Sequence, residues 1–355
     1  MTEHTMNTID LRSDTVTLPS PEMRQSMANA ELGDDVFGED PTVNRLQEMA
    51  AATLGKEAAL LVTSGTQGNL TAMLTHCRRG DEVILGKLSH SVIFEVGGAS
   101  ALGGLIMRTV RNDSNGRLDL GEVSAAIRPP DDHFARTGLI ALENTHNLCG
   151  GAVLSEEDLS AVRHLTDRHW LPVHMDGARI FNAAVALGIP ASRLAAFADS
   201  VTFCLSKGLG CPIGSVLCGS GEFITEARRY RKMLGGGMRQ AGVIAAAGIY
   251  ALENMVERLA EDHENARLAA EGLAKVAGIT LAPAPQTNLV YFTVDGWNLT
   301  DLVRRLGELG VLCFDEGGRI RWVTHFGIER ADVEEAVSRL QTVMGSGVPV
   351  SRAGA

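Results

Sequence analysis

The chain has 355 residues, 45% hydrophobic and 21% charged, and its formal net charge at pH 7 is −11. This composition is typical of a globular enzyme-sized protein, and the negative charge argues against binding to nucleic acid, which needs basic patches. The longest apolar stretch, residues 241–252, is too short to span a membrane, so we expect no membrane insertion.

The cysteines and histidines point away from a metal centre. The six cysteines are scattered without a C-x-x-C pair, and the ten histidines include no HExxH or other tight pair. The first residues do not show a basic segment followed by an apolar one, as a signal peptide would. We therefore expect reduced cysteines, no metal and a cytoplasmic location.

Apolar β-rich segments alternate with helix-like segments along the first two thirds of the chain. This alternation predicts an α/β fold with a mainly parallel, doubly wound sheet. The predicted strands are 58–63, 82–85, 105–110, 138–142, 171–175 and 201–205, and the predicted helices are 66–78, 119–127, 155–168 and 179–187. Residues 213–220 follow the last strand after a short loop, so we expect them to return antiparallel to it.

A second, smaller unit is expected toward the C-terminus. From residue 238 a long apolar periodicity predicts helix, and then 279–294, 299–309 and 319–324 resemble strand, helix and strand of a small α+β domain. The predicted division is an N-terminal arm packing with the small domain, a large α/β domain, a small domain and a flexible tail: 1–19, 20–250, 251–345 and 346–355.

In open parallel sheets ligands bind beyond the carboxyl ends of the strands, so residues that follow strands carry the functional information. The first strand runs into "TSGTQGN", residues 63–69. A turn of this kind before a helix presents free N–H groups to an anion, and Ser64 and Thr66 add hydroxyl donors. The alternative is an ordinary helix cap. No G-x-G-x-x-G or P-loop follows a strand, which disfavours an NAD-binding protein.

Two charged residues end the fifth and sixth strands. Asp176 follows an apolar run, where an unpaired carboxylate is costly, so it needs a cationic partner; Arg179 is one candidate, in a purely structural pair. Lys207 is the only charged residue between Asp199 and Glu222. A buried lysine can lose its proton and act as a nucleophile, whereas the alternative is a lysine that reaches solvent or pairs with a carboxylate.

Two more residues fall near the same edge. His90 follows the second strand, either as a capped loop residue or as an aromatic plate against a planar ligand. Arg239 follows three glycines, in either a hinge or a mobile loop that delivers a guanidinium to an anion. Together, an anion site, an aspartate, a lysine and an aromatic plate match the needs of pyridoxal 5′-phosphate (PLP), whose aldehyde forms a Schiff base with lysine and whose ring nitrogen needs a carboxylate.

The sequence also resembles a known family. The segments "IDLRSDTVTLPSPEM" (9–23), "GDDVFGEDPTVNRLQ" (33–47), "HFARTGLIALENTHN" (133–147), "HMDGARIFNA" (174–183), "SKGLGCPIGS" (206–215) and "RKMLGGGMRQAG" (231–242) are similar to those of low-specificity L-threonine aldolases. These are fold-type-I PLP-dependent enzymes, and the resemblance runs from about residue 9 to 340 with the motifs in order.

The resemblance implies a role for each matching residue. Lys207 would bind the cofactor covalently, Asp176 would face its ring nitrogen and His90 would stack on its ring. Gly65 and Thr66 would bind its phosphate together with Arg239 of a neighbouring subunit. The substrate carboxylate would be held by Ser13, Arg179 and Arg321, and His133 would lie near the β-hydroxyl group. Either His90 or His133 would act as the base.

The implied activity is the reversible retro-aldol cleavage of L-threonine, L-allo-threonine and related β-hydroxy-α-amino acids to glycine and an aldehyde. The resemblance further implies a homotetramer with its active sites at subunit interfaces. The alternatives are an aldolase that prefers aromatic substrates such as phenylserine, or a PLP enzyme that catalyses β-elimination or transamination with the same lysine and aspartate.

Overall fold

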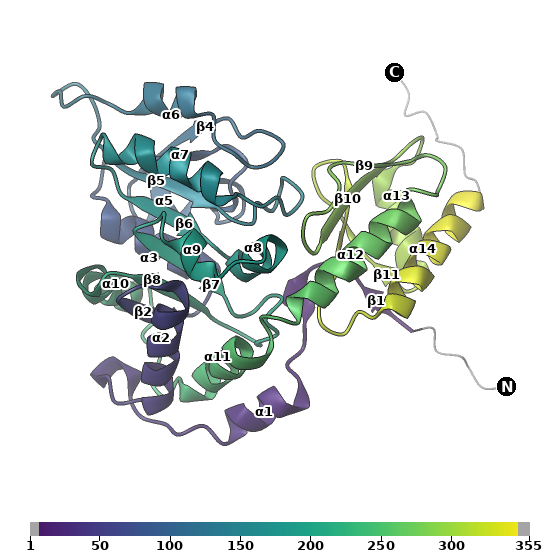
Figure 1. Ribbon diagram of the computed structural model, residues 1–355, viewed down its shortest axis with the longest axis horizontal. Helices are drawn as coiled ribbons and strands as arrows, with labels where there is room; N and C mark the ends of the chain where they lie inside the picture. The colour runs from purple at the N-terminus through teal and green to yellow at the C-terminus, as the bar shows by residue number, and fades with distance from the viewer. Residues whose placement is uncertain (1–6, 347–355) are drawn as a thin grey trace.

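The computed structural model describes residues 7–346 and consists of a larger and a smaller body (Figure 1). Except for Ser346, the predicted tail at 346–355 lies outside the described residues. Within the described range no helix combines the length and apolar character needed to cross a membrane.

The larger body is built on a seven-stranded sheet in the order β2-β8-β7-β6-β5-β3-β4. The strands are β2 (Ala58–Val62), β3 (Glu82–Gly86), β4 (Ile106–Val110), β5 (Thr137–Glu143), β6 (Val173–Asp176), β7 (Ser200–Cys204) and β8 (Ser215–Gly219). All neighbours are parallel except β8, which runs antiparallel to β2 and β7. The predicted α/β class, the six strands and the antiparallel return strand are confirmed.

Helices cover both faces of this sheet because alternate strand residues are apolar on both sides. Ile84 and Ile140 belong to a core shared with the helices of one face, whereas Val83 and Leu139 pack with those of the other. The first face carries α2 (Pro41–Leu54), α6 (Leu120–Ala126), α7 (Glu156–Asp167), α8 (Ile180–Leu187) and α9 (Ala191–Ala195); the second carries α3 (Gly65–His76), α5 (Gly98–Ala101) and α10 (Gly221–Met233).

The smaller body contains a four-stranded antiparallel sheet in the order β12-β13-β10-β9. Its elements are α12 (Leu259–Leu273), β9 (Ile279–Leu281), β10 (Leu289–Val294), α13 (Leu299–Glu308), β11 (Val311–Leu312), β12 (Phe314–Asp315), β13 (Ile320–Val323) and α14 (Arg330–Gly345). The predicted strand at 279–294 is two strands separated by a segment that contains two prolines. The helix α14 was not predicted; it packs against α12 and α13.

Two segments connect the bodies. The predicted long helix after residue 238 is divided into α11 (Gly242–Asn254) and α12. The chain passes from the larger to the smaller body between these two helices (Figure 1). The N-terminal strand β1 (Ile9–Asp10) pairs in parallel with β11, and Ile9 joins the core of the smaller body. Further on, α1 (Pro21–Ala28) packs against α11. The pairing of β1 with β11 supports the predicted N-terminal arm, whereas the predicted boundary at residue 250 falls inside α11. We retain the predicted division as a proposal.

Candidate active site

One edge of the large sheet gathers the ends of its parallel strands. The strands β3, β5, β6 and β7 end there at Gly86, Glu143, Asp176 and Cys204, and β2, parallel in direction to β7, ends at Val62. Most of the predicted site residues follow these ends, as expected for ligand sites in open α/β sheets.

The turn after β2 forms an anion cradle. The Ser64 Oγ accepts the Gln67 N–H at 3.1 Å and caps α3, which leaves the N–H groups of Gly65 and Thr66 at the free start of the helix. A Cβ atom on Gly65 would lie 2.8 Å from the Cys204 Sγ, so only glycine fits without a shift. The nearby Ser215 Oγ is buried and has no hydrogen-bond partner among the described residues, a donor set that fits a phosphate group.

Asp176 is buried at the end of β6 and is held by neutral donors. Its carboxylate accepts a hydrogen bond from the Asn69 Nδ2 at 2.8 Å and another from the Ala178 N–H at 3.0 Å. The candidate structural pair with Arg179 does not form, because Arg179 instead pairs with Asp14. The carboxylate of Asp176 therefore has no arginine partner within the described residues, and it is available to a cationic ligand.

A second buried carboxylate, which the sequence reasoning missed, lies beside Asp176. Glu95 accepts hydrogen bonds from the Asn69 Nδ2 at 2.9 Å and from the His90 Nδ1 at 3.0 Å. The sequence held a signal for it, since Glu95 is the only Asp, Glu, Lys or Arg between Lys87 and Arg108. One potential metal-ligand atom from each of His90, Glu95 and Asp176 lies within 4.8 Å of the other two. The two carboxylates already accept hydrogen bonds from the Asn69 amide.

His90 begins the short helix α4 (His90–Ile93), and the backbone N–H of His90 donates to the Glu143 Oε2 at 2.8 Å. Burial alone would lower the pKa of His90, but the hydrogen bond to Glu95 and the charge of Asp176 outweigh it and raise the pKa. The charge of Lys207 acts in the opposite direction and lowers the pKa. Lys207 follows β7, the strand that pairs with β6, at whose end Asp176 lies. Lys207 itself is half-buried, three residues after the end of β7.

The two predicted carboxylate-binding arginines come from different bodies and meet at one side chain. The Nη1 atoms of Arg179 and Arg321 lie 3.4 and 3.5 Å from the Asn147 Oδ1. The Asn147 N–H donates to the Glu143 Oε1 at 2.8 Å, which fixes the loop after β5. Asn147 is a further residue that the sequence reasoning did not single out, although it lies in a quoted motif.

Each arginine is also paired with a carboxylate of the chain. The Nε and Nη2 of Arg179 donate to Asp14 at 2.6 and 2.7 Å, and Ser13 lies next to this pair at the cap of a 3₁₀ turn, Asp14–Val16. The Arg321 Nη1 donates to both oxygens of Glu316 at 3.0 and 3.1 Å, whereas its Nε is buried with no partner among residues 7–346. Both guanidinium groups thus retain N–H groups for a further anion.

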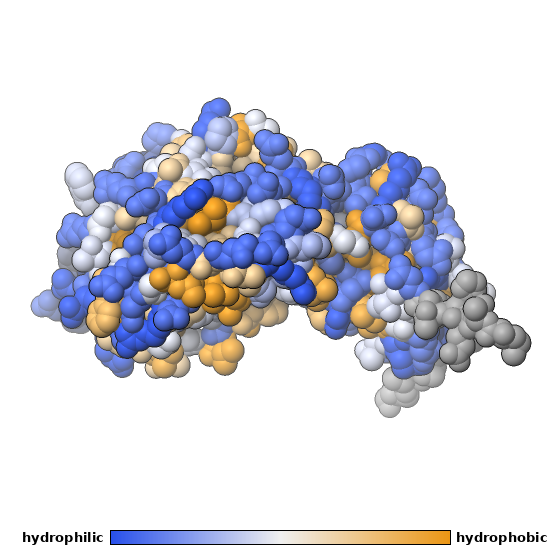
Figure 2. All heavy atoms as spheres, turned by 90° about the horizontal axis from the view of Figure 1, so that it is seen from below, coloured by the Kyte–Doolittle hydropathy of each residue, from blue (hydrophilic) through white to orange (hydrophobic). Residues whose placement is uncertain are grey.

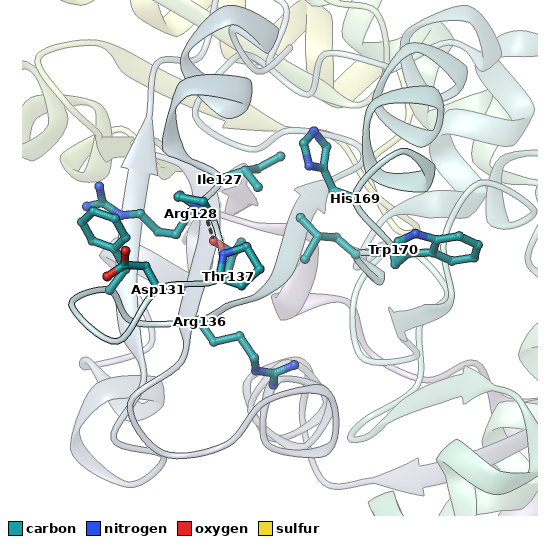
Figure 3. Close-up of a pocket in the computed structure, with 11 residues that line it drawn as sticks. Ile127, Arg128, Asp131, Arg136, Thr137, His169 and Trp170 are labelled. Carbon is teal, nitrogen blue, oxygen red and sulfur yellow. Dashed lines mark hydrogen bonds between the residues drawn. The ribbon is translucent and has the colours of Figure 1, made fainter.

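Two predicted residues are not brought to this cluster within the chain. The side chain of His133 is 89% exposed and bonds to Asp131, in the loop before β5. This loop lies at the amino end of β5, the opposite edge of the sheet, next to the pocket of Figure 3 that Asp131 and Trp170 help to line. Arg239 is largely exposed and pairs with Asp34 at 3.2 Å.

Comparison with solved structures identifies the fold. A threonine aldolase from Leishmania major superposes with a TM-score of 0.80 at 20% sequence identity, covering 94% of this chain and 99% of that chain. The architecture is that of the fold-type-I PLP-dependent enzymes, with a mostly parallel central sheet and a small antiparallel sheet.

Sequence relatives identify the family. The model of the β-eliminating lyase family matches residues 10–295. Low-specificity L-threonine aldolase 1 of Arabidopsis thaliana is 48% identical, covering 96% of this chain and 97% of the relative. Low specificity L-threonine aldolase of Escherichia coli (strain K12) is 47% identical, covering 93% and 97%. The chain belongs to the β-eliminating lyase family and, within it, to the low-specificity L-threonine aldolases, which confirms the resemblance.

Proposed function

We propose that this protein is a PLP-dependent aldehyde-lyase that cleaves L-threonine, L-allo-threonine and related β-hydroxy-α-amino acids reversibly to glycine and an aldehyde. The observation that carries the proposal is the edge of the sheet where the cradle at Gly65, the buried Asp176 and Lys207 gather, with two arginines meeting at Asn147. The names of the relatives support the same activity.

The donors and acceptors at this edge fit PLP. Lys207 would hold its aldehyde carbon, Asp176 its ring nitrogen and His90 its ring face, and the phosphate would take the N–H and hydroxyl donors of the cradle, Ser64, Gly65 and Thr66. We assign Arg239 to the phosphate of a neighbouring subunit, because its guanidinium is exposed in its own chain. When bound, PLP supplies an electron sink for the electron pair of the breaking Cα–Cβ bond.

The arginines bind and orient the amino acid. Arg179 is fixed by the bidentate pair with Asp14, and Arg321 retains an unpartnered buried Nε, so both can donate to an α-carboxylate. Ser13 adds a hydroxyl beside the same pair. Because the two arginines belong to different bodies, their relative position sets the orientation of the substrate at Cα.

We assign proton removal from the β-hydroxyl group to His90. Its Nδ1–H donates to Glu95, which leaves the Nε2 lone pair free to accept a proton. The raised pKa of His90 makes it a stronger base, and the carboxylate beside it stabilises the imidazolium that forms. His133 remains the alternative base, for which a neighbouring subunit must supply the residue.

We propose a homotetramer with active sites at subunit interfaces, in the cytoplasm. Several large apolar side chains are exposed on the single chain, among them Leu18, Phe37 and Met233, and Figure 2 shows apolar side chains gathered on one face of the larger body. All six cysteines are free and buried, which is compatible with a reducing compartment.

The test begins with the purified chain incubated with PLP, reduced with borohydride and digested. We expect the pyridoxyl group on Lys207 and no adduct in the Lys207→Ala variant. L-threonine, L-allo-threonine and phenylserine should then yield glycine and the corresponding aldehyde. Pyruvate and ammonia from L-serine, without glycine from threonine, would favour the β-eliminating alternative that the family model raises. Absence of any adduct would refute the proposal.

A further inference from the structure

A chain of buried polar side chains runs from Asp176, at the carboxyl end of β6, to Ser200, at the amino end of β7, and on to His76 at the end of α3. The Asn69 Nδ2 donates to Asp176, and the Asn69 Oδ1 lies 3.1 Å from the His174 Nε2. The His174 Nδ1 lies 2.9 Å from the Ser200 Oγ, which in turn lies 2.8 Å from the His76 Nε2. Asn69, His174 and Ser200 are at most 1% exposed, so water cannot replace these contacts.

The partners of Asn69 indicate the direction of the hydrogen bonds in this chain. Both amide hydrogens of Asn69 are used by carboxylates, one by Asp176 and one by Glu95, so its oxygen must face His174 and accept from the Nε2–H. Burial lowers the pKa of His174 to about 3, so the ring is neutral at pH 7 and carries only this one hydrogen.

The same reasoning continues to the end of the chain. Because the Nδ1 of neutral His174 has no hydrogen, it accepts from the Ser200 O–H. The Ser200 Oγ has then used its single hydrogen and accepts from the His76 Nε2–H. Burial also lowers the pKa of His76, to about 4, so this ring is neutral too. Each donor hydrogen therefore points toward Asp176.

If the side-chain amide of Asn69 were rotated by half a turn, its oxygen would face the two carboxylates. This orientation is favourable only if Asp176 or Glu95 carries a proton. The Nε2–H of His174 prevents the rotation, because it would then face the amide hydrogens. The Ser200 hydroxyl keeps His174 in that tautomer.

We propose that His174 is a positioning residue that, through the amide orientation of Asn69, keeps the carboxylate of Asp176 hydrogen-bonded and directed into the cofactor site, while Ser200 and His76 fix the tautomer of His174. This inference rests on the proposed function, in which an ionised Asp176 holds the proton on the ring nitrogen of PLP. His174 touches neither cofactor nor substrate; it acts through Asn69.

The first measurement needs no cofactor. In the ¹⁵N-histidine NMR spectrum of the cofactor-free chain, we expect His174 to be neutral and protonated at Nε2 throughout the neutral pH range. A spectrum that shows the Nδ1–H tautomer would overturn the proposal, whether or not any variant folds. If the wild-type chain failed to bind PLP at Lys207, the proposed function would fail, but the tautomer would still be measurable.

A matched pair of variants then tests the effect on cofactor binding. His174→Gln can place an amide N–H near the position of Nε2, whereas His174→Asn reaches only the position of Nδ1. We expect the dissociation constant for PLP to rise about tenfold in His174→Asn and by no more than about threefold in His174→Gln. Equal losses in both variants would show that only packing matters and would overturn the proposal.

Two further variants complete the test. Ser200→Ala removes the donor to His174 and should weaken PLP binding, but in the His174→Asn background it should have no further effect, because Ser200 acts only through His174. Thr71→Val is the control: Thr71 is buried on the same helix as Asn69, and its hydroxyl has no partner in the described chain, so the affinity should not change. Fully additive losses of affinity for Ser200→Ala and His174→Asn would overturn the proposal.

Discussion

The buried ion pair between Asp14 and Arg179 offers a sharp test of how the N-terminal segment is fixed to the site. Asp14 is 0% exposed and Arg179 6%, and two charge-assisted hydrogen bonds of 2.6 and 2.7 Å join them. Asn288 adds a longer hydrogen bond, of 3.3 Å, to the same carboxylate. Replacing Asp14 by Asn keeps one acceptor oxygen but removes the charge and turns an amide group toward the guanidinium.

The expected cost follows from these contacts. Each charge-assisted hydrogen bond contributes about 1.5 to 3 kcal/mol, and leaving one partner of a buried ion pair unmatched costs about 3 to 5 kcal/mol. We therefore expect Asp14→Asn to lower the free energy of unfolding by about 3 to 5 kcal/mol. The assay is equilibrium urea unfolding of the cofactor-free chain, which avoids any contribution from ligand binding.

The pH dependence gives a second readout of the same pair. Burial alone would raise the pKa of Asp14, but the charge and hydrogen bonds of Arg179 hold the pKa below its usual range. A carboxyl group with a lowered pKa in the folded state stabilises the protein above its unfolded pKa of about 3.9, and the effect is lost as pH falls through the folded pKa. The difference between wild type and variant should therefore be constant from pH 7 to about 4 and shrink only below.

Glu334→Gln is the control, because it removes an ion pair with Arg330 in which both side chains are about two-thirds exposed. We expect this variant to change the free energy of unfolding by about 0.5 kcal/mol or less. If Asp14→Asn cost no more than the control, the pair would not be holding the N-terminal segment, and the reasoning from its burial would be refuted.

Three further outcomes are expected. Gly65→Ala should cost about 1 to 3 kcal/mol in urea unfolding and weaken PLP binding, because the added Cβ would lie 2.8 Å from the Cys204 Sγ; unchanged values would contradict the cradle. Glu95→Gln should lower the pKa of His90, measured by NMR titration of the cofactor-free chain, because a charged hydrogen-bond partner is lost; a higher pKa would count against the pairing. His133→Ala should leave the free energy of unfolding within about 0.5 kcal/mol of the wild-type value, since the side chain is 89% exposed; a large loss of stability would show that the side chain is not free in solution.

The regular elements of the larger body were predictable because their signals are local. The strands at 58–63 and 201–205 are short apolar runs rich in branched residues, and each agrees with the observed strand to within one residue. The smaller body was less predictable. Its strand at 279–294 is interrupted near Pro283, and α14, with polar residues over much of its length, gave a weak apolar pattern.

The candidate site was predictable only in part. Three residues that follow strand ends could be identified: Asp176, Lys207 and His90. A charged or polar side chain in an apolar neighbourhood is costly unless a partner or a ligand compensates it. Glu95 met the same criterion and was missed. Asn69 and Asn147 carry no such signal, since a neutral amide on a helix or in a loop is common, and their importance comes from what they bond.

Residues close together in the chain set the fold class, the position of the strand ends and the chemistry available at each, so all three could be predicted. The partners of the charged side chains depend on tertiary contacts. Arg179 pairs with Asp14, 165 residues away, rather than with Asp176 three residues before it, and Arg321 meets Asn147 across the two bodies. Such pairs depend on the order of strands in the sheet and on the return of the N-terminal arm to the smaller body, which no local pattern encodes.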